Sequence, residues 1–424
     1  MSRLAAEQSA AHTADHAVDV AVPTPAEADA RLAEAAALPG AAELLDASTL
    51  SELLGRSVEI RRLRLKPGSS LAAGLVDDRG RHGWALLTGD DDKIAAARRR
   101  AARHGGGFAH RGLHGSRLLS GDLINDPELA KELGVARDGM PGLTAHILRY
   151  NPRRRVVGLD AEQSMVVRVA AERQDHLVAA AVRWRAVGVP VLDHQVVGRR
   201  GTAVASPLWG AGDLLAPSTT VTAEALVAAA ASAGEAIGRL HRRTLRRPSP
   251  DCASTVRRLD PAAGAAAEAL ALPAPWLAAE ATDLARRLTQ MLPDGGADAA
   301  ETAQLHGDLS PDQVLIDDAG TSTPDIRLID LDRCGTGDPM RDVGSWLASC
   351  HRLALPRLQE AFLDGYAAEA PLDPTRLAAW EAHAHLEAAV DPFRRREHDW
   401  PQAMRRTLDH ARRALDGATD GAGA

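Results

Sequence analysis

The sequence predicts an α+β protein of two lobes, in which a β-rich part is followed by a helical part. Segments 57–76 and 145–159 have the Pro or Gly turns and the strand composition of β-hairpins. From about residue 220 the apolar residues follow helical spacing, which only a short β stretch at 303–333 interrupts. Since such a chain forms two packed units, we expect a ligand site where they meet.

Composition and charge exclude several classes of function. The 424 residues suit two or three domains, and 45% hydrophobic with 25% charged residues is a globular balance. A net charge of −7 gives no general attraction to nucleic acid. Cys252, Cys334 and Cys350 have no metal-type spacing, and the sequence has neither a membrane-spanning apolar run nor a signal-peptide core. We therefore expect a soluble cytoplasmic protein that binds neither nucleic acid nor membranes.

The order of elements suggests an internal duplication. The string Leu-Arg-x-x-Pro occurs at 63–67 and again at 148–152, and each copy lies in a hairpin that a strand and a helix follow. Two unrelated hairpins are the alternative. We predict a leader at 1–40, either a loose helix or disordered, then a cap-like α+β domain at 41–138. A second β-rich lobe at 139–215 and a helical lobe at 216–424 follow. The segment 45–135 could instead be a protein-interaction platform.

The candidate chemistry is concentrated in residues 305–342. Phosphoryl transfer needs one carboxylate for the attacking hydroxyl and further oxygen ligands for metal ions. Asp308 follows His306-Gly307, and Gln313 offers an amide oxygen five residues later. Asp330 follows the apolar pair Leu328-Ile329, and a hairpin through Asp317–Gly320 would bring it back beside the loop. An ordinary turn followed by a solvated strand end is the alternative.

These residues resemble the aminoglycoside phosphotransferase and choline kinase-like family, whose loop usually has His-Gly-Asp-x-x-x-x-Asn. Gly337-Asp338-Pro339 and Asp342 resemble its second motif. The resemblance implies a bilobal protein-kinase-like fold with an N-terminal β-rich cap domain, an antiparallel-sheet N-lobe and a helical C-lobe. It implies an ATP-dependent kinase for a hydroxyl of a sugar, an amino sugar or an aminoglycoside-type antibiotic. In that family Asp308 would be the catalytic base, Gln313 and Asp330 the Mg²⁺ ligands, and His306 and Asp342 supports of the loop.

Two departures from the family pattern bear on function. Gln313 replaces the usual Asn, which is similar to maltokinase-type sugar kinases that carry an N-terminal cap. Arg168 stands in the strand where the family has a phosphate-binding Lys, and the next helix offers no clear Glu partner. Arg168 is either a phosphate contact or an exposed strand residue. A nucleotide-binding pseudokinase or regulatory module without turnover is therefore the second functional hypothesis.

Two further segments resemble nucleotide-binding parts of the family. Residues 205–214 resemble the hinge, so the backbone near Ser206 and Leu208 would contact adenine. The turn Asn151–Arg155 lies where a phosphate-covering loop would be, although a solvated hairpin tip is the more ordinary interpretation. The sequence determines neither the acceptor nor the choice between ATP and GTP.

Overall fold

The computed structural model describes residues 21–246, 258–259, 262–292, 301–317 and 324–421. Cys252, most of the expected turn at 317–320 and residues 1–20 of the expected leader lie outside these ranges. The rest of that leader contains a helix, α1 (Pro25–Ala35). Thr24 begins this helix with a capping box, in which its hydroxyl accepts from the Glu27 N–H and the Glu27 carboxylate accepts from the Thr24 N–H.

Two antiparallel five-stranded sheets have the same strand order. The first sheet is β1-β2-β3-β5-β4, with α4 (Asp91–His104) between its third and fourth strands in sequence, and the second is β6-β7-β8-β10-β9, with α6 (Asp175–Ala186) at the same place. The strands are β1 (Val58–Lys66), β2 (Ser70–Asp77), β3 (His82–Thr88), β4 (Phe108–Leu113), β5 (Ser116–Asp122), β6 (His146–Asn151), β7 (Arg155–Asp160), β8 (Met165–Ala170), β9 (Gln195–Val197) and β10 (Ala203–Pro207).

The turns of the two first hairpins match residue for residue. Lys66 pairs with Ser70 across one turn, and Asn151 pairs with Arg155 across the other. The second turn residue is left-handed in both, with φ of 62° at Gly68 and at Arg153. The shared strand order and turn geometry support the duplication that the sequence suggests.

Short helices connect and cover these sheets. Helices α2 (Ala41–Leu45) and α3 (Ala47–Leu54) precede the first sheet, while η1 (Leu123–Asn125), α5 (Ala130–Gly139) and η2 (Pro141–Thr144) lie between the sheets in sequence. Leu129, Leu133 and Leu143 share a core with Val167 and Val169 of the second sheet. We therefore propose that the second lobe begins near residue 123, earlier than the boundary at 138–139 that the sequence suggested.

The helical lobe follows the second sheet and encloses four short strands. Helices α7 and α11 pack so closely that a Cβ atom added at Gly234 would lie 2.1 Å from the Phe362 carbonyl oxygen. None of the described helices is long and apolar enough to cross a membrane. The elements are α7 (Ala223–Thr244), α8 (Ala263–Ala271), η3 (Pro275–Leu277), α9 (Ala278–Met291), β11 (Ala303–Leu305), η4 (Pro311–Gln313), β12 (Val314–Ile316), β13 (Ile326–Leu328), η5 (Leu331–Arg333), β14 (Gly335–Gly337), α10 (Met340–Leu353), α11 (Pro356–Glu369), α12 (Pro374–Ala388), α13 (Asp391–Arg395) and α14 (Trp400–Gly421).

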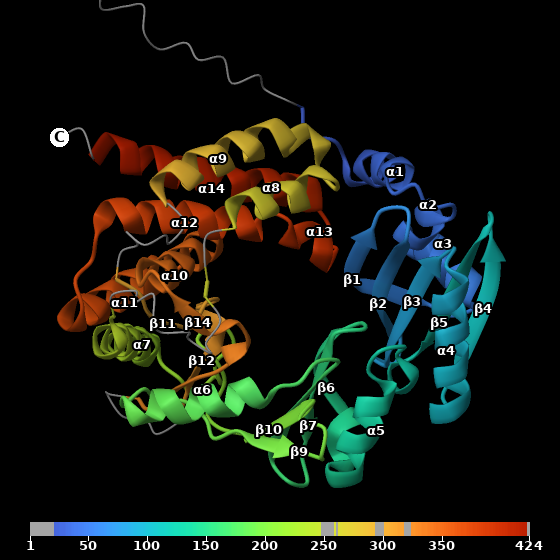
Figure 1. The fold of residues 1–424 in the computed structure, drawn as a ribbon, viewed down its shortest axis with the longest axis horizontal. Coiled ribbons are helices and arrows are strands. Elements are labelled where there is room, and N and C mark those ends of the chain that lie inside the picture. Colours follow the sequence, from blue (N-terminus) through green and yellow to red (C-terminus); the bar gives the residue numbers. More distant parts are fainter. Residues whose placement is uncertain (1–20, 247–257, 260–261, 293–300, 318–323, 422–424) are drawn as a thin grey trace, which may run out of the picture.

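The first sheet lies between the second sheet and helices α13 and α14, as Figure 1 shows. Arg396 joins helix α1 of the N-terminal unit to the helical lobe through two contacts with the Asp29 carboxylate, at 2.7 and 2.8 Å. At the other side, the ring centroids of His82 in β3 and Tyr150 in β6 lie 6.1 Å apart, and a Cβ atom at Gly74 of β2 would lie 3.0 Å from Pro152 of the β6–β7 hairpin. The N-terminal unit therefore contacts both of the other parts of the molecule.

Candidate active site

The loop after β11 is held by one buried carboxylate. Asp342, at the start of α10, accepts from the backbone N–H groups of His306 and Gly307 at 2.7 and 2.8 Å. Gly307 has φ of +84°, and a Cβ atom there would lie 2.3 Å from the Arg333 carbonyl oxygen, so the loop requires glycine. The loop is braced by Asp342, as the sequence suggested, and this fixes the backbone of Asp308.

Further hydrogen bonds hold the side chain of Asp342 in place. Asp342 is fully buried, and its Oδ2 lies 3.2 Å from His241 Nε2, while His241 Nδ1 lies 3.0 Å from the Tyr366 hydroxyl. Burial would raise the pKa of Asp342, but the hydrogen bonds from His241 and the Gly307 N–H, together with the nearby His306, outweigh it and lower the pKa. His306 Nε2 contacts the Ile329 carbonyl oxygen at 2.9 Å.

Asp308 lies at the open end of this arrangement. Its side chain is 46% exposed, and its Oδ1 lies 3.3 Å from Nη1 of Arg333. Although part of the side chain is exposed, the surrounding protein removes water from the carboxyl and raises the pKa of Asp308 from 3.8 to about 6, while the positive charge of Arg333 opposes the rise. A carboxylate with this pKa is ionised at neutral pH and is more basic than an ordinary aspartate, as a general base requires.

Gln313 has the properties of a metal ligand. Its backbone N–H donates to the Ser310 carbonyl, and its backbone carbonyl accepts from the Ile329 N–H, both at 3.0 Å. The backbone of Gln313 is therefore fixed beside the strand that leads to Asp330. Its side chain is buried, and its Oε1 has no hydrogen-bond partner among the described residues. A buried carbonyl oxygen without a partner is costly unless a ligand completes it, and amide oxygens suit hard divalent cations.

Asp330 adopts a backbone conformation that is uncommon for residues other than glycine. Its φ and ψ are 58° and 51°, in the left-handed region, directly before the turn η5. Three arginines of the second sheet surround its carboxylate, with N–O distances of 3.2 Å from Arg168 and 3.8 Å from both Arg149 and Arg155. Burial raises the pKa of Asp330, but these arginines outweigh it and lower the pKa, so Asp330 carries its charge.

Asp332 shares two of these arginines. Arg155 and Arg168 each form an ion pair with its Oδ2, and burial together with the charge of Asp330 raises its pKa. The other edge of Arg168 donates from Nε to Gln174 Oε1 at 3.0 Å. Gln174, directly before α6, thus holds Arg168 where the sequence had revealed no acidic partner. Arg168 is 16% exposed and contacts both aspartates, so it is not merely an exposed strand residue.

The first sheet matches one arginine of this group and lacks the other two. Matching the two sheets through their first hairpins places Arg64 at the position of Arg149, Ser70 at that of Arg155 and Leu86 at that of Arg168. Leu86 is buried and apolar. If the sheets arose by duplication, only the second one has the two arginines that pair with Asp332.

The segment expected to contact adenine follows β10 in the connection to the helical lobe. Ser206 pairs with Val166 in the sheet, and the Leu208 N–H donates to the Ser164 carbonyl oxygen at 2.8 Å. The Leu208 N–H is engaged in this bond, and the contact of the backbone near Ser206 and Leu208 with adenine stays a prediction. Beyond it, the Ala211 N–H donates to the Ile316 carbonyl, which fixes the connection along β12.

The structure brings Asp308, Gln313, Asp330 and Arg168 together at the junction of the second sheet and the helical lobe. Ser206 and Leu208 lie in the connection between these parts. Sequence reasoning missed the direct roles of Arg149, Arg155 and Arg333. The Arg-rich turn at 153–155 was a partial signal for the arginines of the second sheet. Of its arginines, Arg155 reaches the aspartates.

The fold and this arrangement of carboxylates, amide and arginines define a kinase-like small-molecule phosphotransferase. The chain belongs to the phosphotransferase enzyme family (APH), whose model matches residues 149–386. It is therefore a phosphotransferase that acts on hydroxyl groups of small molecules. The match begins in β6, so the first sheet lies outside it. A search of curated proteins gives no match.

Several solved structures are similar to this chain at low sequence identity. A choline/ethanolamine kinase family protein from Mesorhizobium loti is 15% identical, with a TM-score of 0.44, and the match covers 68% of this chain and 94% of that one. Amicoumacin kinase hAmiN, solved with AMP-PNP, Ca²⁺ and Ami, is 14% identical with a TM-score of 0.45, covering 66% and 92%. A microcompartment-associated aminopropanol kinase is 18% identical with a TM-score of 0.44, covering 78% and 97%. Because these TM-scores are low, the family assignment rests on the match of residues 149–386 to the family model.

Proposed function

We propose that the chain transfers the terminal phosphoryl group of ATP to a hydroxyl of a small polar metabolite such as a sugar, an amino sugar or an aminoglycoside-type antibiotic. Asp308 acts on the acceptor hydroxyl, and Gln313 with Asp330 holds Mg²⁺. One observation carries this proposal: the backbone positions of all three residues are tied together. Asp342 fixes the loop of Asp308, and the bond from the Ile329 N–H to the Gln313 carbonyl joins the other two segments.

The donor set suits a hard divalent cation. Gln313 Oε1 is a buried oxygen without a partner among the described residues, and the Asp330 carboxyl keeps its charge because its pKa is lowered. When bound, Mg²⁺ would neutralise part of the negative charge of the phosphate groups. Both ligand types are oxygens, as Mg²⁺ prefers.

The proposed reaction moves one phosphoryl group and one proton. The acceptor oxygen forms a bond to the terminal phosphorus, and the bond from that phosphorus to the bridging oxygen of ADP breaks. The hydroxyl proton passes to the Asp308 carboxylate. The products are a phosphate monoester and ADP. Asp308 suits this role because its pKa of about 6 leaves it deprotonated at neutral pH.

The arginines of the second sheet would bind the nucleotide phosphates. In the structure Arg155 and Arg168 instead pair with Asp332, and Arg168 also contacts Asp330. An arriving phosphate offers these guanidinium groups the same bidentate contacts that the carboxylates give them. We therefore propose that nucleotide binding turns the arginines toward phosphate and leaves Asp330 free for the metal.

The charges around the acceptor side disfavour a polycation. Arg62 of β1 lies near arginines of β6 and α13, and burial together with these neighbours lowers its pKa to about 10, although Asp391 opposes this. Arg352 is within electrostatic range of both Asp308 and Asp391. A neutral or anionic hydroxylated acceptor fits these positive charges better than a polycationic antibiotic does.

The test is turnover. Purified protein with Mg-ATP is incubated with three groups of hydroxylated compounds: neutral sugars, sugar acids or phosphates, and polyamines of the aminoglycoside type. We expect ADP release that depends on the acceptor, with a gain of one phosphate group in its mass. A broad panel without acceptor-dependent turnover would contradict the enzymatic proposal, and turnover on polyamines alone would contradict the proposed charge preference.

One observation favours a second candidate function, a nucleotide-binding module without turnover. The ion pairs of Arg155 and Arg168 with Asp332 and Asp330 occupy carboxylates that a metal would need. If these pairs persist when nucleotide binds, the site holds nucleotide without catalysing transfer. A thermal shift on adding ATP, with no turnover on any acceptor, would favour this candidate.

The interaction-platform hypothesis for residues 45–135 needs a test other than deletion. Deletion would remove Leu129 and Leu133, which share the core of the second sheet. Loss of activity would then report a damaged lobe. Substitutions on the exposed strand β4 would separate the two ideas, because they leave that core intact.

A further inference from the structure

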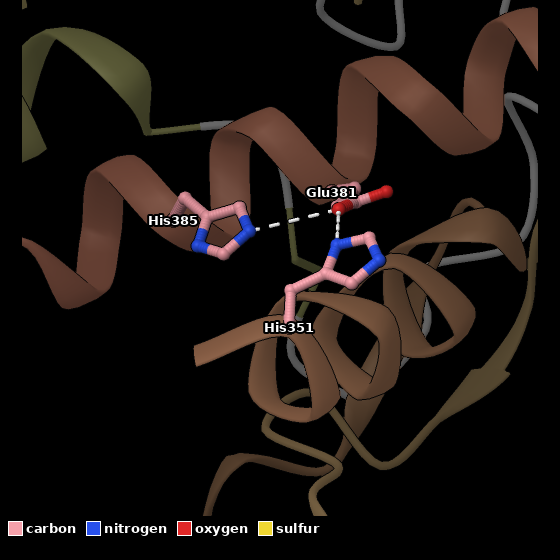
Figure 2. Close-up of side chains that lie close together, drawn as sticks. All are labelled: His351, Glu381 and His385. Carbon is pink, nitrogen blue, oxygen red and sulfur yellow. Dashed lines mark hydrogen bonds and ion pairs between the residues drawn. The ribbon is translucent and has the colours of Figure 1, made fainter. Parts of the chain in front are cut away.

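A group of three side chains in the helical lobe lies apart from the candidate active site. His351 is near the end of α10, and Glu381 and His385 lie one turn apart on α12 (Figure 2). Residues at positions i and i+4 share one face of a helix, so α12 presents both side chains to α10. The ligand atoms of all three residues lie within 4.8 Å of one another. The two helices thus bring two imidazoles and one carboxylate to a single point.

His385 is an unpartnered polar group at the buried end of this cluster. It has no exposed surface, and neither ring nitrogen has a hydrogen-bond partner among the described residues. The nearest carboxylate oxygen, Glu381 Oε1, lies 3.6 Å from its Nε2, which is too far for a hydrogen bond. A buried imidazole without a partner is costly, which indicates that a ligand completes it.

The protonation states suit a metal ion. Burial alone would raise the pKa of Glu381, but the hydrogen bond from His351 and the nearby imidazole of His385 lower it to about 2, so the carboxylate is charged. Burial lowers the pKa of His385 to about 4, so its imidazole is neutral at pH 7. The hydrogen bond to Glu381 raises the pKa of His351, whose proton a metal would displace. A neutral imidazole and an ionised carboxylate are the forms that bind metal ions.

We propose that His351, Glu381 and His385 form a binding site for a divalent first-row transition metal ion such as Zn²⁺. Two imidazoles and one carboxylate are a known ligand set for zinc, with a fourth position left for water. Bond lengths of about 2.0–2.1 Å in a tetrahedral site place the donor atoms roughly 3.4 Å apart. His351 Nδ1 lies 2.5 Å from Glu381 Oε1 and must move outward, which is possible because its side chain is 42% exposed.

The ion would join helix α10 to helix α12. Helix α10 begins with the residues around Asp342, which brace the catalytic loop, and His351 lies nine residues further along it. We therefore expect the ion to stabilise the helical lobe. It would be distinct from the Mg²⁺ proposed at Gln313 and Asp330, because nitrogen donors favour borderline metals while amide and carboxylate oxygens favour hard ones.

Metal binding is measured on chelator-treated full-length protein that carries no histidine tag. Co²⁺ is titrated in excess Mg²⁺, which keeps the oxygen-ligand site filled. We expect one Co²⁺ per chain with the visible absorption of a four- or five-coordinate ion, and its displacement by one equivalent of Zn²⁺. We also expect Zn²⁺ to raise the melting temperature. Absence of stoichiometric Co²⁺ binding would overturn the proposal.

Variants assign the site. His351→Gln changes the half-exposed ligand and leaves the buried ones in place, so the variant should fold, and we expect its affinity for Co²⁺ to fall at least about 10-fold. Glu381→Gln should weaken binding further. His398→Ala, at an exposed histidine outside the cluster, is the matched control and should bind as the wild type does. Unchanged affinity in His351→Gln, or loss of binding in Asp330→Asn, would show that the ion binds elsewhere.

Discussion

Arg168 and Asp330 join the second sheet to the segment after β13, with Arg168 Nη1 lying 3.2 Å from Asp330 Oδ1. The same guanidinium group pairs with Asp332 and is held from behind by Gln174. One arginine thus bridges the two carboxylates nearest the proposed metal and stands where the family has its phosphate-binding lysine. The proposed function requires this bridge to open when Mg-nucleotide binds.

Arg168→Ala should therefore weaken nucleotide binding. We expect KM for ATP to rise about 10–100-fold, which corresponds to loss of one charge-assisted contact of about 1.5–3 kcal/mol. Arg168→Lys keeps the positive charge but not the forked guanidinium group. Its KM for ATP should therefore lie between that of the wild type and that of Arg168→Ala. Arg199→Ala, at an exposed arginine of the same lobe, is the control. Steady-state kinetics with varied ATP measure the effect, and a KM that stays unchanged in Arg168→Ala would refute the phosphate contact.

Gln313 should show opposite effects on stability and activity. Gln313→Leu replaces a buried, unpartnered amide oxygen by an apolar group of similar size, so the free energy of unfolding should stay the same or rise. Activity should fall, and the Mg²⁺ concentration for half-maximal activity should increase. Gln313→Asn keeps an amide oxygen on a shorter arm and should retain more activity. Urea unfolding and Mg²⁺ titrations measure the two properties, and full activity of Gln313→Leu would contradict the metal role.

The features that could be predicted from the sequence are local. The two hairpins are marked by their own turn residues, and the loop of Asp308 carries its glycine and its amide within a few positions of one another, while its brace, Asp342, belongs to a second motif 35 positions after Gly307. Both sheets and the braced loop are found in the structure. The strand order is the same in both sheets, and each sheet forms from five strands that follow one another in the sequence.

The features that the sequence did not reveal depend on long-range packing. Arg155 and Arg168 reach Asp332 across 177 and 164 positions, and spacing gives no sign of such pairs. His351 meets Glu381 only because α10 packs on α12. The bond from the Leu208 N–H to the Ser164 carbonyl depends on how the connection after β10 returns along β8. Each of these contacts is set by tertiary structure.

Asp308→Asn should lower kcat by roughly 100-fold or more, as expected on removing a positioned base. Asparagine is nearly the same size and accepts no proton, so the fold and nucleotide binding should persist. Asp364→Asn, at an exposed position of α11, is the matched control and should leave kcat unchanged. An unaltered kcat in Asp308→Asn would remove Asp308 from the mechanism.

The pH dependence should follow Asp308. Its carboxyl must be deprotonated to accept the proton, and its pKa is about 6, so kcat/KM should fall as the pH drops through that value. Arg333 lowers this pKa, so Arg333→Gln should raise it and move the acid limb of the profile to higher pH. Arg333→Lys keeps the positive charge and should leave the limb near its original position. A limb that does not move in Arg333→Gln would assign it to another group.

Asp126, between β5 and α5, should help to position the arginines of the second sheet. Its buried carboxylate accepts from the Tyr150 hydroxyl at 2.5 Å and the Arg153 N–H at 2.8 Å, and so fixes the hairpin whose strands carry Arg149 and Arg155. In Asp126→Asn one acceptor oxygen becomes a donor that faces the remaining donors. We expect the free energy of unfolding to fall by about 2 kcal/mol and KM for ATP to rise.

Two comparisons separate positioning from stability in that variant. Tyr150→Phe removes a single hydrogen bond and should cost about 1 kcal/mol, whereas Asp138→Asn, at an exposed position of α5, should change neither property. Urea unfolding and steady-state kinetics are measured on the same preparations, below the temperature at which the variant unfolds. If Asp126→Asn loses stability but keeps the KM of the wild type, the Asp126 carboxyl stabilises the hairpin without positioning its arginines. A raised KM in the folded variant would show that the segment between β5 and α5, in which Asp126 lies, positions the arginines for the nucleotide.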